Sequence, residues 1–286
     1  MSPVEIGMLS VVAIVVLVYM GLYIPIALGL VSFVSVWIMS GKSILAFNFL
    51  KIAVGDGVTE YNFATIPLFT LMGLLVSKAG LGRDIYDVMN STFRKVLAGI
   101  GMATVGANAV FAAITGSSIA SASVFTKISV PEMLRYNYSK RFAVGVVAGS
   151  SVLGMIIPPS AMLIIYSFIS EQSVGDMFLA GIVPGLLLTG AYIFAIFAMA
   201  RIWPSYIGQD IKADEMPALD TSETIHKAWP VIALIFLVLG GIYTGWLTPV
   251  EAGAAGASLA LVIAALRKSM SWNGLWSTLV ETGHIT

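Results

Sequence analysis

The sequence contains no cysteine and carries very little charge. Asp, Glu, Lys and Arg make up 10% of its 286 residues, with 15 basic and 15 acidic side chains and two histidines. A soluble domain has about 25% charged residues, so this composition excludes an ordinary soluble domain. The absence of cysteine excludes disulfides and thiolate metal sites, and a net charge of zero argues against nucleic-acid binding.

The sequence contains several long segments without any charged residue. Hydrophobic residues make up 58% of the chain, and the mean hydropathy is +0.94. A helix that crosses a bilayer needs about 20 mostly apolar residues. The sequence therefore predicts an all-α polytopic membrane protein whose spans are drawn from the uncharged runs 6–41, 61–77, 96–126, 142–170, 177–200, 228–250 and 252–266.

The positive charges predict how these segments are arranged across the membrane. Lys and Arg accumulate on the cytoplasmic side. If residues 97–131 enter and leave by the cytoplasmic face, every Lys and Arg except Lys42 and Lys51 lies on that side. If residues 97–131 cross fully, the basic cluster at 127–141 moves outside. The charge pattern therefore favours a re-entrant hairpin over residues 97–131.

The stretch "FAAITGSSIASASVF" at residues 111–125 has the composition expected of such a hairpin. A turn at mid-membrane leaves backbone polar groups unpaired, so it is tolerated only against protein or water. Thr115, Gly116, Ser117 and Ser118 supply a flexible backbone and hydroxyl groups, and Ser121 adds a hydroxyl on the outgoing arm. The alternative is that these small residues are packing positions in an ordinary helix bundle.

A second interruption is predicted in "GSSVLGMIIPPSAMLIIYSF" at residues 149–168, within the uncharged segment 142–170. Pro158 and Pro159 cannot continue a helix, so carbonyl groups at 154–157 should be freed. Together with the hydroxyl groups of Ser150, Ser151 and Ser160, these carbonyls suit a small hard cation. The alternative is a simple proline kink.

Neither of the stretches 111–125 and 149–168 contains an Asp, Glu, His, Lys or Arg residue. Proton-coupled carriers generally use intramembrane carboxylates or histidines as relays. Their absence favours Na⁺ as the coupling ion, held by oxygen dipoles at Gly116, Ser117, Ser118 and Pro158. No cofactor is expected. The chain shows no paired carboxylates and no nucleophile with a neighbouring base, so we do not expect an enzyme.

A weak internal repeat predicts the domain organisation. With Pro25 placed over Pro249, each copy has an apolar helix, a Gly/Pro turn, a second apolar helix, a basic–Ser junction and an amphipathic stretch. The first copy contains an odd number of crossings, so the second should be inverted, as in many secondary transporters. The sequence ends soon after the second copy begins, so we expect it to be the N-terminal part of a longer protein.

This pattern divides the chain into four predicted regions. Residues 1–60 form scaffold spans and an interfacial arm helix, and residues 61–200 form a transport unit with the hairpin and the Pro-broken helix. Residues 201–227 form a cytoplasmic loop, and residues 228–286 start the second, incomplete inverted repeat.

Several motifs, in this order along the chain, resemble those of the DctM-like large membrane subunit of tripartite ATP-independent periplasmic (TRAP) transporters. They are "ATIPLFTLMGLLVSKAGL" (64–81), "FAAITGSSIASASVF" (111–125), "GSSVLGMIIPPSAMLIIY" (149–166), "MFLAGIVPGLLL" (177–188) and "GIYTGWLTPVEAGAAG" (241–256). The family hairpin usually reads Gly-x-Ser-Gly-Ser, and Thr115 here occupies the first serine position. The family's second hairpin has no counterpart in this sequence.

The resemblance implies an elevator-type, Na⁺-driven importer of small organic anions such as dicarboxylates or sialic acid in the bacterial inner membrane. Its partners would be a periplasmic substrate-binding protein and a small four-helix membrane subunit. Gly116, Ser117, Ser118, Pro158, Pro159 and Ser160 would line one half of the Na⁺ and substrate site. Two alternatives remain open: an ion-coupled organic anion carrier that works without a binding protein, and a channel or structural membrane subunit.

Overall fold

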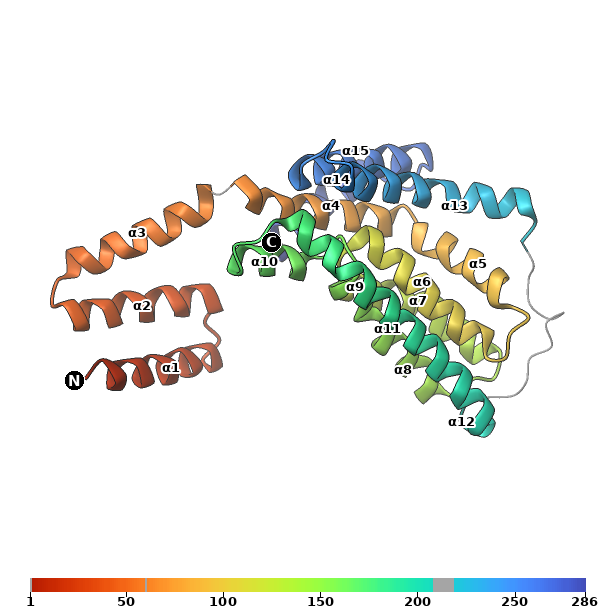
Figure 1. The fold of residues 1–286 in the computed structure, drawn as a ribbon, viewed down its shortest axis with the longest axis horizontal. Coiled ribbons are helices and arrows are strands. Elements are labelled where there is room, and N and C mark those ends of the chain that lie inside the picture. The colour runs from red at the N-terminus through yellow and green to blue at the C-terminus, as the bar shows by residue number, and fades with distance from the viewer. Residues whose placement is uncertain (1, 60, 208–218) are drawn as a thin grey trace. The chain divides into compact units, whose positions relative to one another are not determined.

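All regular elements of the described chain are helical. The computed structural model describes residues 2–59, 61–207 and 219–286, and no strand occurs within them. This confirms the prediction of an all-α protein. The chain divides into two compact units, Met1–Phe63 and Ala64–Thr286 (Figure 1). Residues 208–218 of the predicted loop 201–227 lie outside the described residues.

The first unit contains α1 (Pro3–Tyr19), α2 (Ile24–Ser40) and α3 (Ser43–Thr59). The long apolar run 6–41 is thus two helices, because Gly21 turns the chain with φ +90° and Pro25 follows in the first turn of α2. Ser10 of α1 and Ser35 of α2 are joined by a hydrogen bond of 2.7 Å between their hydroxyl oxygens. Outside this bond α1 and α2 expose many large apolar side chains, as a lipid-facing pair does.

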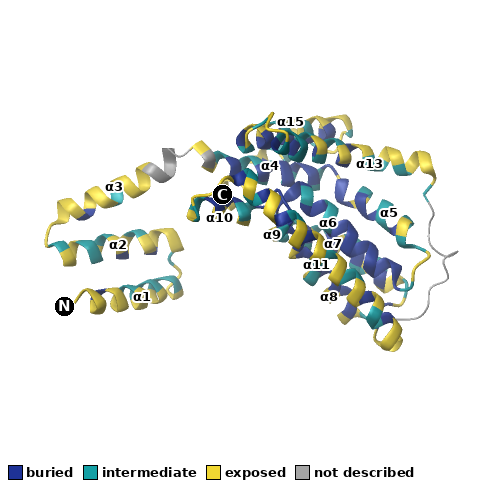
Figure 2. Ribbon diagram, in the orientation of Figure 1, coloured by how far each residue is buried: buried dark blue, intermediate teal, exposed yellow. Residues whose placement is uncertain are grey.

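The second unit holds most of the buried core. Its helices are α4 (Thr65–Lys78), α5 (Leu81–Phe93), α6 (Gly99–Thr115), α7 (Ser118–Arg135), α8 (Lys140–Ser151), α9 (Leu153–Ile156), α10 (Ala161–Ile169), α11 (Val174–Ile202), α12 (Pro204–Ile207), α13 (Thr221–Ile235), α14 (Gly241–Tyr243), α15 (Pro249–Leu266) and α16 (Trp272–Ile285). A short 3₁₀ turn, η1 (Tyr61–Ala64), precedes α4, and a π-helical turn, η3 (Phe236–Gly240), joins α13 to α14. Figure 2 shows α6 as almost wholly buried and much of α11 and α13 as exposed.

Several of these helices have the length and composition of membrane spans. Val174–Ile202, Thr221–Tyr243 and Pro249–Leu266 are each long and apolar enough to cross a bilayer. Two further segments pass the same test only as bent pairs: α4 with α5, which meet at 67°, and Lys140–Ile156 with α10, which meet at 42°. Within the described residues, these features agree with the predicted polytopic membrane protein.

The sequence analysis assigned no element between the span 61–77 and the hairpin, and the structure has the helix α5 there. Leu81 and Ile85 face the core one turn apart, and they are 0% and 4% exposed. The charged residues lie on the other side of the helix. Asp84 forms an ion pair with Arg267 at the end of α15, and Asp87 forms one with Lys227 of α13 at 2.9 Å. The charged residues of this segment therefore attach an amphipathic helix to its neighbours.

The second predicted repeat copy has the same order of elements as the first. The helical segment ending at Tyr243 is followed by a turn at Gly245 with φ +74°, and Pro249 lies in the first turn of α15. Thr248 caps α15 through a reciprocal capping box with Glu251, whose carboxylate accepts from the Thr248 amide at 2.8 Å. The amphipathic stretch after the basic–Ser junction is α16, the counterpart in order of α3. The predicted inversion across the membrane stays a prediction.

Candidate ion and substrate site

The polar stretch at the centre of residues 97–131 is a sharp turn between two helices. α6 ends at Thr115, and Gly116 adopts a left-handed conformation with φ +59°. Ser117 is extended and caps α7, where its hydroxyl oxygen accepts a hydrogen bond of 3.3 Å from the amide of Ala120. The Gly–Ser pair thus ends one helix and starts the next, as the composition of the stretch suggested.

The two arms of this turn pack against each other. The ring of Phe111, before the turn, meets the ring of Phe125, after it, edge to face with centroids 5.5 Å apart. Figure 1 shows α6 and α7 side by side in the second unit. The chain therefore folds back as a helical hairpin, and an unbroken helix through residues 97–131 is excluded.

The predicted break at Pro158 and Pro159 is also present. α9 ends at Ile156, the Pro158–Pro159 peptide bond is cis, and α10 starts at Ala161. One expectation was wrong in part, because not all carbonyls from 154 to 157 are free. The hydroxyl of Ser160 donates to the carbonyl oxygen of Met155 at 2.7 Å, so this side chain closes the end of α9.

The structure brings the hairpin turn and the proline break into direct contact. A Cβ atom placed on Gly116 would lie 2.0 Å from the carbonyl oxygen of Pro159, and one on Gly154 would lie 2.8 Å from the backbone of Ser117. The amide of Ala161 donates to the carbonyl oxygen of Gly116 at 3.3 Å. We call this contact, formed by residues 115–118 and 154–161, the junction. Only glycine permits so close an approach of the two backbones.

Four helix ends meet at the junction. α6 and α9 end there with their carbonyl groups, while α7 and α10 begin there with their amide groups. The N-terminal end of a helix carries partial positive charge and the C-terminal end partial negative charge. The junction therefore offers amides to an anion and carbonyls to a cation in one place, with no charged side chain of its own.

The residues of the junction differ in their exposure. Gly116, Pro158 and Pro159 are buried, and Ser160 is 0% exposed. Ser117 and Ser118 are only half-buried, and the next residue, Ile119, is 80% exposed. The two serines at the start of α7 are therefore the polar side chains of the hairpin turn that a solute can reach.

Four predicted site residues remain. Thr115 is part of the junction but its side chain bonds within its own helix, and Ser121, Ser150 and Ser151 lie outside the junction. The hydroxyl of Thr115 donates to Phe111 at 3.0 Å, and that of Ser151 donates to Ala148 at 2.9 Å. Ser121 is buried on α7, and its Oγ has no hydrogen-bond partner in the part of the chain that the structure describes. The hydroxyl of Ser150 contacts Asn108 of α6 instead of the hairpin turn.

Asn108 is a polar residue that the sequence analysis missed. It is 0% exposed, and its side-chain amide donates to Ser150 Oγ at 2.7 Å. In the sequence it stands alone in a run of Ala, Gly and Val. The only available signal was the presence of a carboxamide in an uncharged membrane segment, where polar groups need partners.

Small residues on α4 and α11 enclose the junction. Gly73 of α4 packs on the backbone of Thr115, where a Cβ would lie 2.9 Å from the carbonyl oxygen. Gly181 and Gly185 of α11 pack on Ile156 and Ile157, and a Cβ at Gly181 would lie 2.6 Å from the Ile156 carbonyl oxygen. Small residues spaced four apart let membrane helices approach closely. This packing fixes the position of the broken backbone.

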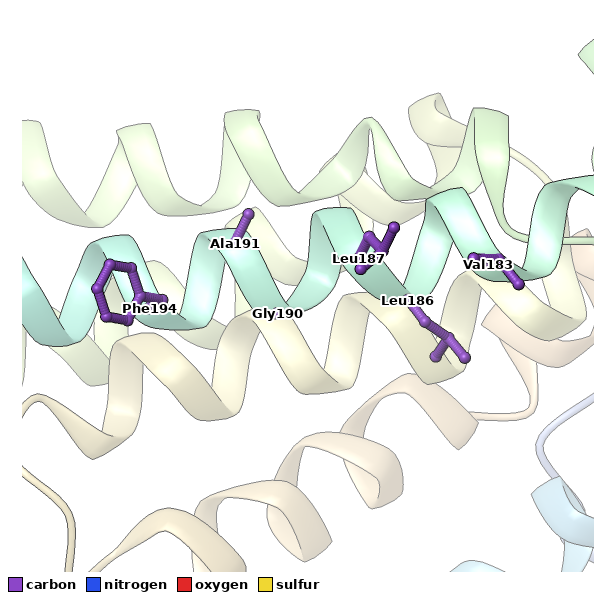
Figure 3. Close-up of a pocket in the computed structure, with 6 residues that line it drawn as sticks. All are labelled: Val183, Leu186, Leu187, Gly190, Ala191 and Phe194. Atoms are coloured by element: carbon purple, nitrogen blue, oxygen red, sulfur yellow. The ribbon is translucent and has the colours of Figure 1, made fainter.

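The outer side of α11 carries a shallow apolar groove of about 500 Å³, lined by Val183, Leu186, Leu187, Gly190, Ala191 and Phe194 (Figure 3). The lining contains no polar side chain, so the groove offers nothing to orient a charged solute. Such a surface is typical of contact with lipid or with another apolar helix. The candidate site is therefore the junction and not this groove.

Comparison with known proteins decides the family. A family model described as the DctM component of the tripartite ATP-independent periplasmic transporter matches residues 11–286. The chain belongs to the DctM family. DctM proteins are transport proteins, so the prediction that the chain is not an enzyme is confirmed by its membership.

Curated DctM-family relatives agree with this assignment. The chain is 32% identical over 242 residues to the C4-dicarboxylate TRAP transporter large permease protein DctM of Pseudomonas aeruginosa, covering 83% of the chain and 55% of that protein. It is 35% identical over 209 residues to the DctM protein of Vibrio cholerae, covering 72% and 44%. The sialic acid TRAP transporter large permease protein SiaM of Vibrio cholerae is 27% identical over 240 residues, covering 84% and 55%. The chain spans about half the length of these relatives.

Proposed function

We propose that this chain is the membrane-embedded transport subunit of a Na⁺-coupled importer of small organic anions. A periplasmic substrate-binding protein delivers the anion, a small four-helix membrane subunit accompanies the chain, and the assembly works in the bacterial inner membrane by an elevator-type movement. The observation that carries this proposal is the junction, where four helix ends meet and the only side-chain polar groups are hydroxyls.

The chemistry of the junction supports an anionic substrate and a cationic partner. The amides at the starts of α7 and α10 suit a carboxylate, and the half-buried Ser117 and Ser118 add hydroxyl groups beside them. The carbonyls at the ends of α6 and α9 suit a hard cation such as Na⁺. Broken helices of this kind form substrate and ion sites in many secondary transporters.

The substrates named for relatives of this chain support the same substrate class. The relatives described above are permeases for C4-dicarboxylates and for sialic acid, and a further relative, YiaN of Escherichia coli, is a permease for 2,3-diketo-L-gulonate. All three substrates are small carboxylates, which fits a site built from helix N-termini. We therefore propose a carboxylate substrate for this chain.

Uptake by the reconstituted transporter tests the proposal. Proteoliposomes containing the permease and its small membrane subunit are given a labelled carboxylate, the cognate binding protein and an inward Na⁺ gradient. We expect uptake that stops when choline replaces Na⁺ or when the binding protein is omitted. Equal uptake without Na⁺ would contradict ion coupling, and equal uptake without the binding protein would favour a carrier that works alone.

A substitution at the hairpin turn tests the site itself. Ser117→Leu should abolish uptake because it removes the hydroxyl and places an apolar side chain at the accessible start of α7. Thr126→Leu, at an exposed position on the same helix, is the matched control and should retain uptake. Both variants should insert into the membrane to the same extent. Normal uptake by Ser117→Leu would contradict a role for the hairpin turn in transport.

A further inference from the structure

Three basic side chains without acidic partners lie where α8 begins and α11 ends. Lys140 and Arg141 are the first residues of α8, Arg201 is in the last turn of α11, and all three are exposed. The amide of Ser139, just before α8, donates to the carbonyl oxygen of Ile207 in α12, which directly follows α11, at 2.8 Å. Within the described residues none of the three basic side chains forms an ion pair. We call Lys140, Arg141 and Arg201 the cationic group.

The two members of the cationic group on α8 are in an electrostatically unfavourable position. The first turn of a helix carries partial positive charge, so it favours acidic side chains and disfavours basic ones. The first turn of α8 contains Lys140 and Arg141 and no acidic residue. Lys227 of α13, by contrast, is compensated by Asp87 at 2.9 Å. The start of α8 therefore has an uncompensated positive charge that an external anion would stabilise.

An exposed face of α11 leads to the cationic group. Residues spaced three or four apart share one face of a helix. One such face of α11 is exposed at each of its positions, which are Val183, Leu187, Gly190, Phe194, Phe197 and Arg201. Its first part belongs to the apolar groove of Figure 3, and its last member is Arg201. Phe194, at the end of the groove, is seven residues before Arg201, or about 10 Å along the helix axis.

This combination of charge and apolar surface matches a phospholipid. One leaflet contributes about 15 Å of hydrocarbon, half of the core of the bilayer. Acyl chains that begin at the level of Arg201 therefore reach past Phe194 into the groove. Trp203 and Tyr206, which are 59% and 47% exposed, follow Arg201 closely, as aromatic residues do at the level of the headgroups. The charge pattern predicts that this end faces the cytoplasm, where anionic lipids attract Lys and Arg.

We propose that the start of α8 and the end of α11 form a binding site for an anionic phospholipid. The cationic group holds the phosphate, and an acyl chain lies along the exposed face of α11 toward Phe194. A helix of another protein would also cover this apolar face, but it gives no reason for three unpaired cations at its end. The site lies outside the junction, and it does not depend on which ion or solute the protein transports.

Native mass spectrometry of the full chain in detergent tests this site. Dioleoylphosphatidylglycerol is titrated into delipidated protein, and each bound lipid is resolved by its mass, which gives a dissociation constant. Dioleoylphosphatidylcholine has the same acyl chains and no net charge, so it is the reference lipid. We expect it to bind at least about tenfold more weakly, because it gains little from the basic residues. Equal binding of the two lipids would overturn the assignment.

Substitutions in the cationic group locate the site. Arg201→Gln should weaken binding of the anionic lipid about fivefold, and combining it with Lys140→Gln and Arg141→Gln should weaken binding about a hundredfold. Arg201→Lys keeps the charge and should bind as the wild type does. Lys268→Gln, at an exposed position after the end of α15, is the matched control and should also bind normally. If Lys268→Gln weakened binding as much as Arg201→Gln, the attraction would be diffuse and the site would be wrong.

Two further ligands separate the headgroup from the acyl chains. Dihexanoylphosphatidylglycerol has the same headgroup, but its six-carbon chains are too short to reach Phe194. It should bind at least about tenfold more weakly than the dioleoyl lipid, because each buried methylene group adds to the affinity. Inorganic phosphate at the same concentration should not displace the dioleoyl lipid. Equal affinity for both chain lengths, or displacement by phosphate, would indicate a site for a soluble anion and would overturn the lipid assignment.

Discussion

Two turns of the chain each contain a glycine with a positive φ angle, but in different surroundings. Gly21, between α1 and α2, and Gly116, between α6 and α7, both adopt positive φ angles, +90° and +59°. A Cβ on Gly21 would meet no atom within 4 Å, whereas one on Gly116 would lie 2.0 Å from the carbonyl oxygen of Pro159. Gly21 serves only the conformation of its own turn. At Gly116 glycine is needed for the conformation of the turn and also because the proline-broken segment packs directly against it.

This difference shows how a glycine at a site can be recognised. A positive φ angle explains why glycine is favoured at either position. It does not explain why the chain needs the space that a side chain would fill. Only at Gly116 is that space taken by the backbone of another segment, and only there do helix ends from two segments meet. The contact, rather than the turn, marks the candidate site.

The largest effect is expected from alanine at Gly116, with alanine at Gly21 as the comparison. Gly21→Ala should cost about 1–2 kcal/mol, the penalty of a side chain in a left-handed conformation. Gly116→Ala should lose the same conformational energy and also overpack the junction, so the total destabilisation should be about 2–5 kcal/mol. Thermal unfolding of both variants in detergent measures the difference. Equal destabilisation would contradict the close contact of Gly116 with Pro159.

A smaller effect is expected where the backbone conformation is ordinary. Gly154→Ala brings a Cβ within 2.8 Å of Ser117 and should cost about 1–3 kcal/mol through overpacking. Gly145→Ala, also in the segment 140–156, meets nothing within 4 Å and should be neutral or stabilise by up to about 1 kcal/mol. Unfolding temperatures of the pair compare the two directly. A stabilising Gly154→Ala would show that α9 lies farther from the hairpin turn.

The smallest effect on stability is expected at the helix caps. Ser117 caps α7 and Ser139 caps α8, each accepting one amide hydrogen bond, at 3.3 Å and 3.2 Å. Replacing either by alanine should cost about 1 kcal/mol. Only Ser117→Ala should also lower uptake, because only that hydroxyl lies at the junction. If both variants kept full uptake, the Ser117 hydroxyl would have a capping role alone.

The sequence was most informative where local chemistry decides the structure. Gly116 followed by Ser117 gives a helix stop and a helix start, and Pro158–Pro159 cannot continue a helix, so both interruptions were predicted at the residues where they occur. Their contact was only an expectation, because nothing local to either segment requires it. It depends on Gly154, whose role appears only when the two backbones are seen together.

The features that the sequence did not reveal depend on distant partners. The packing of α5 was not predicted, because Arg267 and Lys227, which pair with its Asp84 and Asp87, come more than a hundred residues later. Asn108 lies 42 residues from Ser150, so the sequence does not show that they pair. An ion pair or a buried hydrogen bond can be read from sequence only when both members fall in one helix.

The re-entrant path of residues 97–131 is the central claim, and the absence of cysteine makes it directly measurable. Single substitutions Lys95→Cys, Arg135→Cys and Gln172→Cys place thiols at exposed positions before the hairpin, after it and in the turn 171–176. This turn has no Lys or Arg, so the same charge pattern predicts that it faces outward. A membrane-impermeant maleimide is applied to right-side-out and inside-out vesicles. We predict that residues 95 and 135 react from the cytoplasmic side and residue 172 from the periplasmic side. Reaction of residues 95 and 135 from opposite sides would contradict the account.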